Sequence, residues 1–272
     1  METYDYTDPV CPFNTEQYDK KPKVRSIPVD RILKKLDEYL DKNDSKGGIQ
    51  LLSYWLSEAR LGGDERGELA MLNELMGISR TSGDKENAFK YAKEGLDLAE
   101  KTGLLNSVTG ATVSLNAATV YKAFGEPGKA VELYENTEKI YKEFLPENDY
   151  RVGSLYNNMG LALAEIKDFE KAETLYKKAI AVMETLEDRE PEQAITYLNI
   201  ADLIYAKESA EEGEERINAC LDRAEALLDA AKKRDGKYAF MCSHCASVFG
   251  FYGRFLYEEE LKKRAAEIYD GN

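Results

Sequence analysis

The stretch SLNAATVYKAFGEPGKAVELY at residues 114–134 decides the fold, because a second copy, YNNMGLALAEIKDFEKAETLY, occupies residues 156–176. The two copies lie 42 residues apart and align without a gap. The positions that they share most clearly are Asn116 and Asn158, Ala130 and Ala172, and Tyr134 and Tyr176. A helical repeat of this length cannot bury its own apolar face and must stack on neighbouring copies. The pattern therefore predicts an elongated solenoid rather than a compact catalytic domain.

The same register extends in both directions from these two copies. A third copy begins at Tyr197, two more fit upstream at residues 32–56 and 72–96, and a looser one covers residues 242–268. In each copy one residue of the first helix is expected to contact the second helix. These contact residues are Leu36, Met76, Ala118, Gly160, Ala201 and Ala246. Their spacings of 40, 42, 42, 41 and 45 residues predict an all-α chain of about six helical hairpins.

Two segments lack the periodicity of the repeats. Residues 1–28 carry four of the seven prolines of the chain, and proline disfavours a helix interior because it lacks an N–H donor. We therefore expect an extended tail over residues 1–28 and a solenoid domain over residues 29–272. The acidic run at residues 208–215 is expected to form a solvated turn between two helices.

Charge and hydropathy limit the classes of partner. The formal net charge is −14 and the pI is about 4.8. Affinity for nucleic acid depends on Lys and Arg neutralising phosphates, so no nucleic-acid partner is expected. The most apolar stretch, residues 238–257, is interrupted by polar residues and glycines, which predicts no membrane span. The first residues lack a basic segment followed by an apolar run, which predicts no secretory signal and a cytoplasmic protein.

Cys242, His244 and Cys245 form the one cluster of metal-ligating side chains. Residues three apart share a helix face, so both thiols can approach one metal ion. A closed zinc site needs two further ligands, and Cys11 and Cys220 have no paired spacing. Because free cysteine packs as a small hydrophobe, core packing is favoured over a metal site or a redox pair. A nucleophile, a base and an orienting group cannot be assembled, so no catalytic residue, enzyme activity, metal or cofactor is predicted.

These repeats resemble tetratricopeptide repeats. The resemblance rests on the Asn-Ala-Ala-x-x-Tyr, turn glycine, alanine and tyrosine series from Asn116 to Tyr134, and on the matching series from Asn158 to Ala179. It covers about 240 residues, from Val29 to the C-terminus. The usual repeat of the family has 34 residues, and the longer repeat here is similar to those of kinesin light chains and bacterial peptide-sensing regulators. The resemblance implies a right-handed superhelix of helical hairpins.

The resemblance also implies a peptide-binding groove on the concave face, lined by the first helix of each repeat. In the kinesin-light-chain type, a ladder of asparagines holds the backbone of an extended peptide, and Asn116, Asn158 and Asn199 occupy that position here. An asparagine amide both donates and accepts hydrogen bonds, as a peptide backbone requires. The residues expected to face the groove are Asn73, Glu74, Asn116, Thr119, Lys122, Asn157, Asn158, Asn199, Asp202, Tyr205 and His244. Alternatively, the asparagines only satisfy hydrogen bonds between helices.

The function expected from this pattern is a non-enzymatic scaffold that binds an extended peptide or protein segment in the groove. One alternative is a peptide-signal receptor whose ligand changes the curvature of the superhelix. Another is a structural module that forms a homo-oligomer through an aromatic surface made of Phe249, Phe251, Tyr252 and Phe255. A further hypothesis is that the N-terminal tail, which mixes aromatic and acidic residues, folds back into the groove of its own chain.

Overall fold

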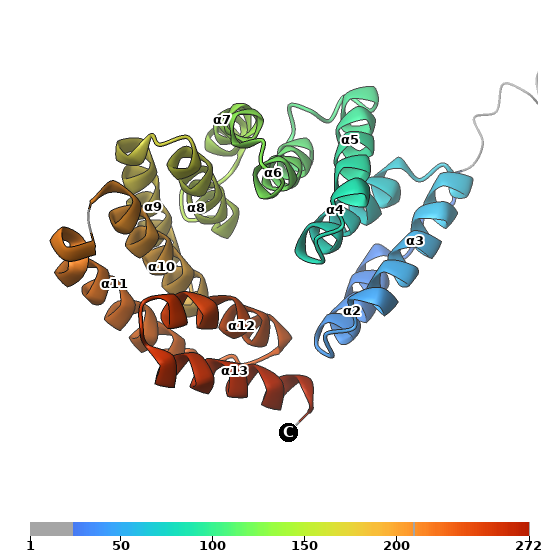
Figure 1. Cartoon of the computed structure of the whole chain (residues 1–272). Helices are drawn as coiled ribbons and strands as arrows, with labels where there is room; N and C mark the ends of the chain where they lie inside the picture. The colour runs from blue at the N-terminus through green and yellow to red at the C-terminus, as the bar shows by residue number, and fades with distance from the viewer. Residues whose placement is uncertain (1–23, 209, 272) are drawn as a thin grey trace, which may run out of the picture.

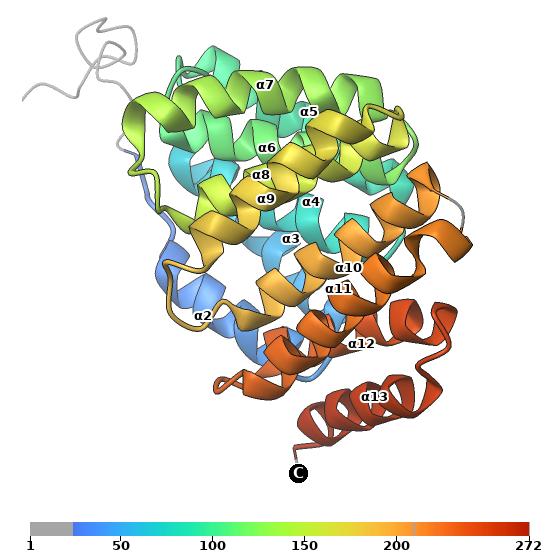
Figure 2. The same cartoon turned by 90° about the vertical axis from the view of Figure 1, so that its left-hand side faces the viewer.

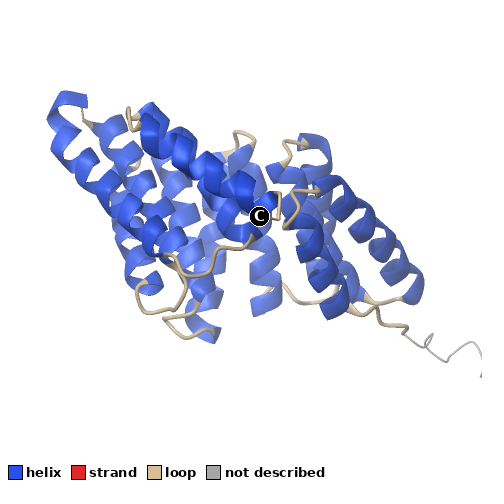
Figure 3. Ribbon diagram, turned by 90° about the horizontal axis from the view of Figure 1, so that it is seen from below, coloured by secondary structure: helices blue, strands red, loops and turns tan. Residues whose placement is uncertain are grey.

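The computed structural model describes residues 24–208 and 210–271, and this part of the chain is built from twelve helices without a strand (Figures 1 and 3). The helices are α2 (Val29–Leu40), α3 (Ser45–Gly62), α4 (Glu65–Thr81), α5 (Lys85–Lys101), α6 (Val108–Ala123), α7 (Pro127–Phe144), α8 (Tyr150–Glu165), α9 (Phe169–Met183), α10 (Glu190–Lys207), α11 (Ala210–Ala230), α12 (Gly236–Phe251) and α13 (Phe255–Tyr269). Within the described ranges, every helix is too short or too polar to cross a membrane. The predicted all-α class is confirmed.

The helices pair into six consecutive hairpins, from α2/α3 to α12/α13, and the hairpins stack into a curved superhelix (Figures 1 and 2). The first five hairpins join through the second helix of one and the first helix of the next, at α3/α4, α5/α6, α7/α8 and α9/α10. The first helices lie inside the curve and the second helices outside it (Figure 1). The predicted count of six hairpins is therefore confirmed.

Three of the turns inside the hairpins, those before α3, α5 and α9, share one local design. The residue two positions before the second helix takes a left-handed conformation, with φ of 75° at Gly83 and 65° at Lys167. An aspartate follows and caps the helix, as where the Asp84 carboxylate accepts a hydrogen bond from the Asn87 backbone N–H at 3.1 Å. Asp168 caps α9 in the same way. Each cap satisfies an N–H group that has no partner within its helix, which fixes where the second helix begins.

The contact residues expected from the repeat register are all buried where the two helices of a hairpin meet: Leu36, Met76, Ala118, Gly160, Ala201 and Ala246. Gly160 shows why a small residue is needed there. A Cβ atom built on Gly160 would lie 2.6 Å from Cε1 of the Tyr176 ring, which is itself buried. The register read from the sequence therefore places the closest helix–helix contacts correctly.

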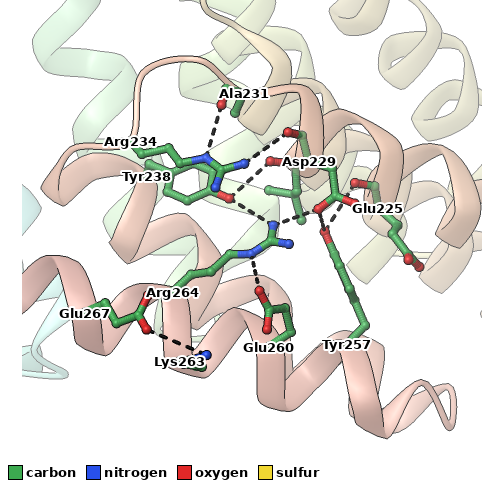
Figure 4. Close-up of polar contacts among 11 residues, drawn as sticks. Glu225, Asp229, Ala231, Arg234, Tyr238, Tyr257, Glu260, Lys263, Arg264 and Glu267 are labelled. Atoms are coloured by element: carbon green, nitrogen blue, oxygen red, sulfur yellow. Dashed lines mark hydrogen bonds and ion pairs between the residues drawn. The ribbon is translucent and has the colours of Figure 1, made fainter. Parts of the chain in front are cut away.

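A polar network joins the last hairpin to the rest of the chain (Figure 4). Arg264 on α13 donates a hydrogen bond to Asp229 on α11 at 2.7 Å and another to the Tyr238 hydroxyl on α12 at 3.2 Å. The Tyr257 hydroxyl on α13 also donates to Asp229, at 2.9 Å. Charge-assisted hydrogen bonds of this kind are shorter and stronger than neutral ones. The Asp229 carboxylate thus holds the orientation of the last hairpin against α11.

The superhelix curves far enough for its two ends to meet. Asp41, directly after α2, lies against Gly236 at the start of α12, where an added Cβ atom would be 2.6 Å from the Asp41 Cα. Figure 1 shows α2 and α12 next to each other where the curve closes, and a cavity of about 670 Å³ lies at this junction. The first helices of the six hairpins therefore surround the concave surface.

The described part of the predicted tail lies against the first hairpins. The Ile27 backbone N–H donates a hydrogen bond to the Asp64 carboxylate at 2.9 Å, and the Ile27 side chain is buried. The Arg25 backbone N–H donates to the Gly62 carbonyl at 2.9 Å. The other part of the tail, residues 1–23, lies outside the described residues, as does the hypothesis that the tail fills the groove.

Two sequence-based expectations are wrong. The acidic run at residues 208–215 is mostly helical, because α11 begins at Ala210 and carries Glu211 in its first turn. Negative charge is favoured there by the helix dipole. Phe249 does not belong to a surface, because its ring is fully buried and lies 4.8 Å from the Tyr257 ring, centroid to centroid. The pairing of α12 with α13 buries this side chain.

We expect Gly160→Ala to be less stable than the matched variant Gly77→Ala. A Cβ atom built on Gly77 in α4 meets no described atom within 4 Å, so Gly77→Ala should raise the unfolding free energy by about 0.5–1 kcal/mol through helix propensity. Gly160→Ala gains the same helix propensity, but the overlap of its Cβ atom with the Tyr176 ring costs about 1–3 kcal/mol of unfolding free energy. Chemical denaturation of both variants measures this difference, and equal stabilities would contradict the close contact.

Candidate peptide-binding groove

Three cavities lie along the concave face. One of about 520 Å³ is lined mainly by α4 and α6, including Asn73 and Thr112. The cavity of about 670 Å³ is lined by α2, α4 and α12, including Phe240, with further residues from the loops after α2, α4 and α11 and from the end of α13. The third, of about 340 Å³, lies between Tyr205 on α10 and Phe251 on α12. Because the first helices supply most of the walls of all three, we treat the concave face as one groove.

The asparagines on this face form two pairs between neighbouring first helices. The Asn116 amide on α6 donates a hydrogen bond to the Asn73 side-chain oxygen on α4 at 2.7 Å. The Asn199 amide on α10 donates to the Asn157 side-chain oxygen on α8 at 2.9 Å, and Thr196 donates to the same oxygen at 3.1 Å. Two of the three residues of the predicted ladder therefore already have a partner in the neighbouring repeat.

The other predicted residues of the first half of the groove differ in their accessibility. Asn158 is half-buried and makes no hydrogen bond to any described side chain, so its amide is available to a ligand. Thr119 is buried, and its hydroxyl contacts the Tyr134 hydroxyl at 3.0 Å, which removes it from the groups that a ligand can reach. Glu74 is half-buried, and burial together with the charge of Asp37 raises the pKa of its carboxyl.

Two cations lie near the C-terminal ends of the first helices α4 and α6. Arg80 on α4 and Lys122 on α6 are both half-buried, and among the described residues neither has an ion-pair or hydrogen-bond partner. Burial lowers the pKa of both groups. Glu165 opposes this shift at Lys122, and the charge of Arg80 adds to it. These two like charges therefore lie close enough to repel each other.

The predicted residue His244 faces these cations from α12. Its side chain is exposed on the concave side. Although the side chain stays in contact with solvent, desolvation by the surrounding protein lowers the pKa of the imidazole. The charges of Lys122 and Arg80 lower it further, and Asp202 opposes the shift. The charges on α4 and α6 therefore act on the imidazole of α12.

Asp202 and Tyr205, the last two predicted residues, lie on α10 next to aromatic side chains of the last hairpin. The Tyr252 hydroxyl donates a hydrogen bond to the Asp202 carboxylate at 2.8 Å. Burial raises the pKa of the Asp202 carboxyl, and this hydrogen bond opposes the shift. The Tyr205 ring meets the Phe251 ring edge to face, with centroids 5.4 Å apart. This end of the groove is therefore aromatic and acidic.

Sequence reasoning missed Arg80, although the repeat register contains the signal. Arg80 and Lys122 each lie four residues after the contact residue of their helix, Met76 in α4 and Ala118 in α6. The same register places Gly77 one residue after its contact residue, on the wall of the 670 Å³ cavity. An alignment of every position of the first helices, rather than of the asparagines alone, therefore identifies Arg80 and Gly77 as further groove residues.

Cys242 and Cys245 are both fully buried in the core of the last two hairpins, which confirms the predicted packing role. Burial raises the pKa of both thiols, and that of Cys245 is also raised by Cys242. Thiols with raised pKa values are poor nucleophiles, because the thiolate is the reactive form. Among the described residues, no group of three or more His, Cys, Asp or Glu side chains is arranged to hold a metal ion.

The stacked hairpins and the groove that they enclose define an α-helical solenoid protein. A family model described as tetratricopeptide repeat matches residues 108–185 and 151–226. The chain is similar to the solved structure of BtubC (BKLC) from P. vanneervenii, with a TM-score of 0.53, 22% identity and coverage of 90% of this chain and 92% of that chain. No match was found among the curated proteins.

Two further solved structures share the fold. The apo form of RapI is similar with a TM-score of 0.64 and 12% identity over 93% of this chain and 86% of that chain. A putative kinesin light chain from Podosopora anserina, with nearly identical TPR-like repeats, is similar with a TM-score of 0.51 and 17% identity over 74% of this chain and 94% of that chain. Residues 108–226 thus carry tetratricopeptide repeats, and these long repeats are similar to those of kinesin light chains. Repeats of this family generally form surfaces for protein interaction rather than catalytic sites.

We expect the neighbours Asn157 and Asn158 to respond differently to alanine substitution. Asn157→Ala removes the acceptor of two hydrogen bonds from α10. It should lower the unfolding free energy by about 1–3 kcal/mol, because the Asn199 amide loses its partner, whereas Thr196 can still donate to the Glu192 carbonyl. Asn158→Ala removes no hydrogen bond among the described residues, so its stability should stay within about 0.5 kcal/mol of wild type. Denaturation midpoints measure both changes. An equal loss in the two variants would contradict the pairing.

Proposed function

We propose that the chain is a non-enzymatic scaffold that binds an extended peptide or protein segment in its concave groove. The observation that supports this most directly is the series of cavities along the first helices, of about 520, 670 and 340 Å³. Pockets distributed along a groove suit a chain that presents side chains at intervals. A single small molecule would fill only one of them.

The polar groups between the cavities suit a polypeptide backbone. The Asn158 amide has no partner among the described residues and can both donate and accept a hydrogen bond. It lies on α8 directly after Asn157, a member of the second asparagine pair, so a segment that passes along α6, α8 and α10 would pass close to it. Paired amides also keep free donor and acceptor capacity, because an asparagine has two donors and two acceptor lone pairs. Such contacts are independent of the sequence of the bound segment.

Homo-oligomerisation is a second candidate function, and exposed apolar side chains near the C-terminus favour it. Phe251, Phe255 and Leu256 expose 61%, 64% and 92% of their surface. Apolar side chains grouped on a surface are typical of interaction sites. Phe249 is buried in the core, so the predicted aromatic surface is reduced to Phe251, Tyr252 and Phe255. The occupant that we propose for this surface is a second copy of the chain.

We expect Gly77→Gln to block the groove without damaging the fold. The new side chain would extend from α4 into a region where no described atom lies within 4 Å of a Cβ atom. It also replaces a glycine inside a helix, which should stabilise α4 by up to about 1 kcal/mol. The probe is a displayed library of random extended peptides, from which binders of the wild-type protein are selected. Their Kd for Gly77→Gln should rise at least tenfold.

Gly77→Ala is the matched control, because it changes the same backbone position but adds no side chain long enough to fill the cavity. Its Kd for the selected peptides should stay within about twofold of wild type, a free-energy change below about 0.5 kcal/mol. Unchanged affinity in Gly77→Gln would contradict binding in the groove. A library that yields no binder to the wild-type protein would also contradict the proposed function.

The oligomer is tested separately by light scattering. If the C-terminal surface joins two copies, the wild-type protein should scatter with a mass that is a multiple of 30.7 kDa. The double variant Phe255→Ser and Leu256→Ser, whose side chains are both exposed, should then return to the mass of one chain. A wild-type protein that remains monomeric at high concentration would rule out this second candidate.

A further inference from the structure

We propose that residues 1–13 of the chain dock on the first hairpin, in a cavity next to Trp55. The cavity has a volume of about 500 Å³ and lies between α2 and α3. It shares no lining residue with the three cavities of the groove, so this inference goes beyond the proposed function. The residues that line it are Pro28, Arg31, Ile32, Lys34, Lys35, Glu38, Leu51 and Trp55.

The repeat register shows what covers this side of a hairpin elsewhere in the chain. Three of the lining residues correspond to positions of α6 that pack into the core of the preceding hairpin, and the pairs are Arg31 with Val113, Lys35 with Ala117, and Glu38 with Val120. The contact is direct at Val113, because a Cβ atom built on Gly95 of α5 would lie 3.2 Å from its Cγ1 atom. The hairpin of α2 and α3 stands at one end of the curve (Figure 1), so the segment that precedes it in the chain is the one that can cover this side.

The cavity combines an aromatic wall with positive charge. Trp55 is half-buried, and its indole ring is part of the lining. Arg31 and Lys34 are exposed, and among the described residues neither side chain has an ion pair or a hydrogen bond. Lys35, by contrast, pairs with Glu38 at 2.6 Å. The cavity therefore suits a segment that brings an apolar side chain together with carboxylates.

The sequence of residues 1–13 is complementary to this surface. The segment contains no Lys or Arg, its acidic residues are Glu2, Asp5 and Asp8, and its aromatic residues are Tyr4, Tyr6 and Phe13. Opposite charges across a contact select the partner and fix its register. A tyrosine adds a large apolar ring whose hydroxyl can stay in water. The alternation of rings and carboxylates thus matches a cavity that holds Trp55, Arg31 and Lys34 together.

The described residues before α2 hold the start of this segment near the cavity. The Arg25 backbone N–H donates to the Gly62 carbonyl at 2.9 Å, and the Arg25 side chain pairs with Glu58 at 3.2 Å. Gly62 and Trp55 lie on the same face of α3, about 10 Å apart along the helix axis. Residues 14–23 can span up to about 33 Å when extended, which is more than this distance. Attachment to the same chain also gives the segment a high effective concentration, so a weak contact is sufficient.

Trp55 is the single tryptophan of the chain, so its fluorescence reports on this cavity alone. Acrylamide quenching of the full chain measures how well the ring is covered, and acrylamide is neutral, so charge changes do not alter its concentration near the ring. Asp5→Lys with Asp8→Lys should release the segment and raise the quenching constant about twofold or more. Arg31→Glu with Lys34→Glu should do the same from the other side. The fourfold variant that combines both reversals should return to the wild-type value.

Two charge-matched controls should leave the quenching constant unchanged. Lys93→Glu with Lys232→Glu changes the charge of the folded part equally, and both lysines are exposed without an ion-pair partner among the described residues. Glu16→Lys with Asp19→Lys changes the charge of the tail outside residues 1–13. Circular dichroism verifies that each variant is folded. The quenching is measured over a range of protein concentrations with light scattering, because docking within one chain does not depend on concentration.

Several results would overturn this docking. Equal quenching in wild type and in both reversal variants would leave the charged side of α2 as a solvated end of the solenoid. A fourfold variant that remains as strongly quenched as the double variants would show that the two sets of charges do not meet. Protection of Trp55 that grows with protein concentration and molecular mass would assign the segment to a second copy of the chain. None of these results affects binding in the groove, which Gly77→Gln tests separately.

Discussion

Each hairpin of this protein has an apolar face that only the next hairpin can cover, and the rest of the structure depends on that constraint. The stacking requires close approach of two helices in every repeat, which is why small residues such as Gly160 and Ala118 occupy the contact positions. It also forces the chain to curve. Six repeats carry the curve to the point where Asp41 meets Gly236. The groove is thus a consequence of packing, and the concave side chains are free to differ between repeats.

The sequence predicts this architecture well because the repeat makes the same packing demand six times. The contact residues, the hairpin count and the burial of Cys242 and Cys245 all follow from the register. Contacts between neighbouring first helices are harder to predict, because they depend on how far each repeat rotates relative to the last. For that reason the sequence did not predict the hydrogen bond between Asn116 and Asn73. The closing of the curve is a sum of five such rotations, so no local pattern encodes it.

The charge of the groove differs from the charge of the chain. A net charge of −14 indicates a neutral or basic partner when the sequence is considered as a whole. In the structure the half-buried cations Arg80 and Lys122 lie on α4 and α6, and acidic side chains occur along the groove, with Glu74 on α4, Glu165 on α8 and Asp202 on α10. A ligand in the groove experiences this local pattern more strongly than the distant surface charges, because salt screens interactions beyond about 10 Å at 0.1 M ionic strength. The groove therefore presents both signs of charge, whereas the chain as a whole is acidic.

The most direct measurement for groove binding is photo-cross-linking from single positions of the full chain. A photoreactive residue is placed at position 77, on the wall of the groove, and in a second protein at position 93, on the outer helix α5. Each protein is irradiated with a peptide selected from the library, and mass spectrometry locates the cross-link. We expect a specific adduct from position 77 and none from position 93. An adduct from position 93 alone would contradict the assignment of the concave face as the binding surface.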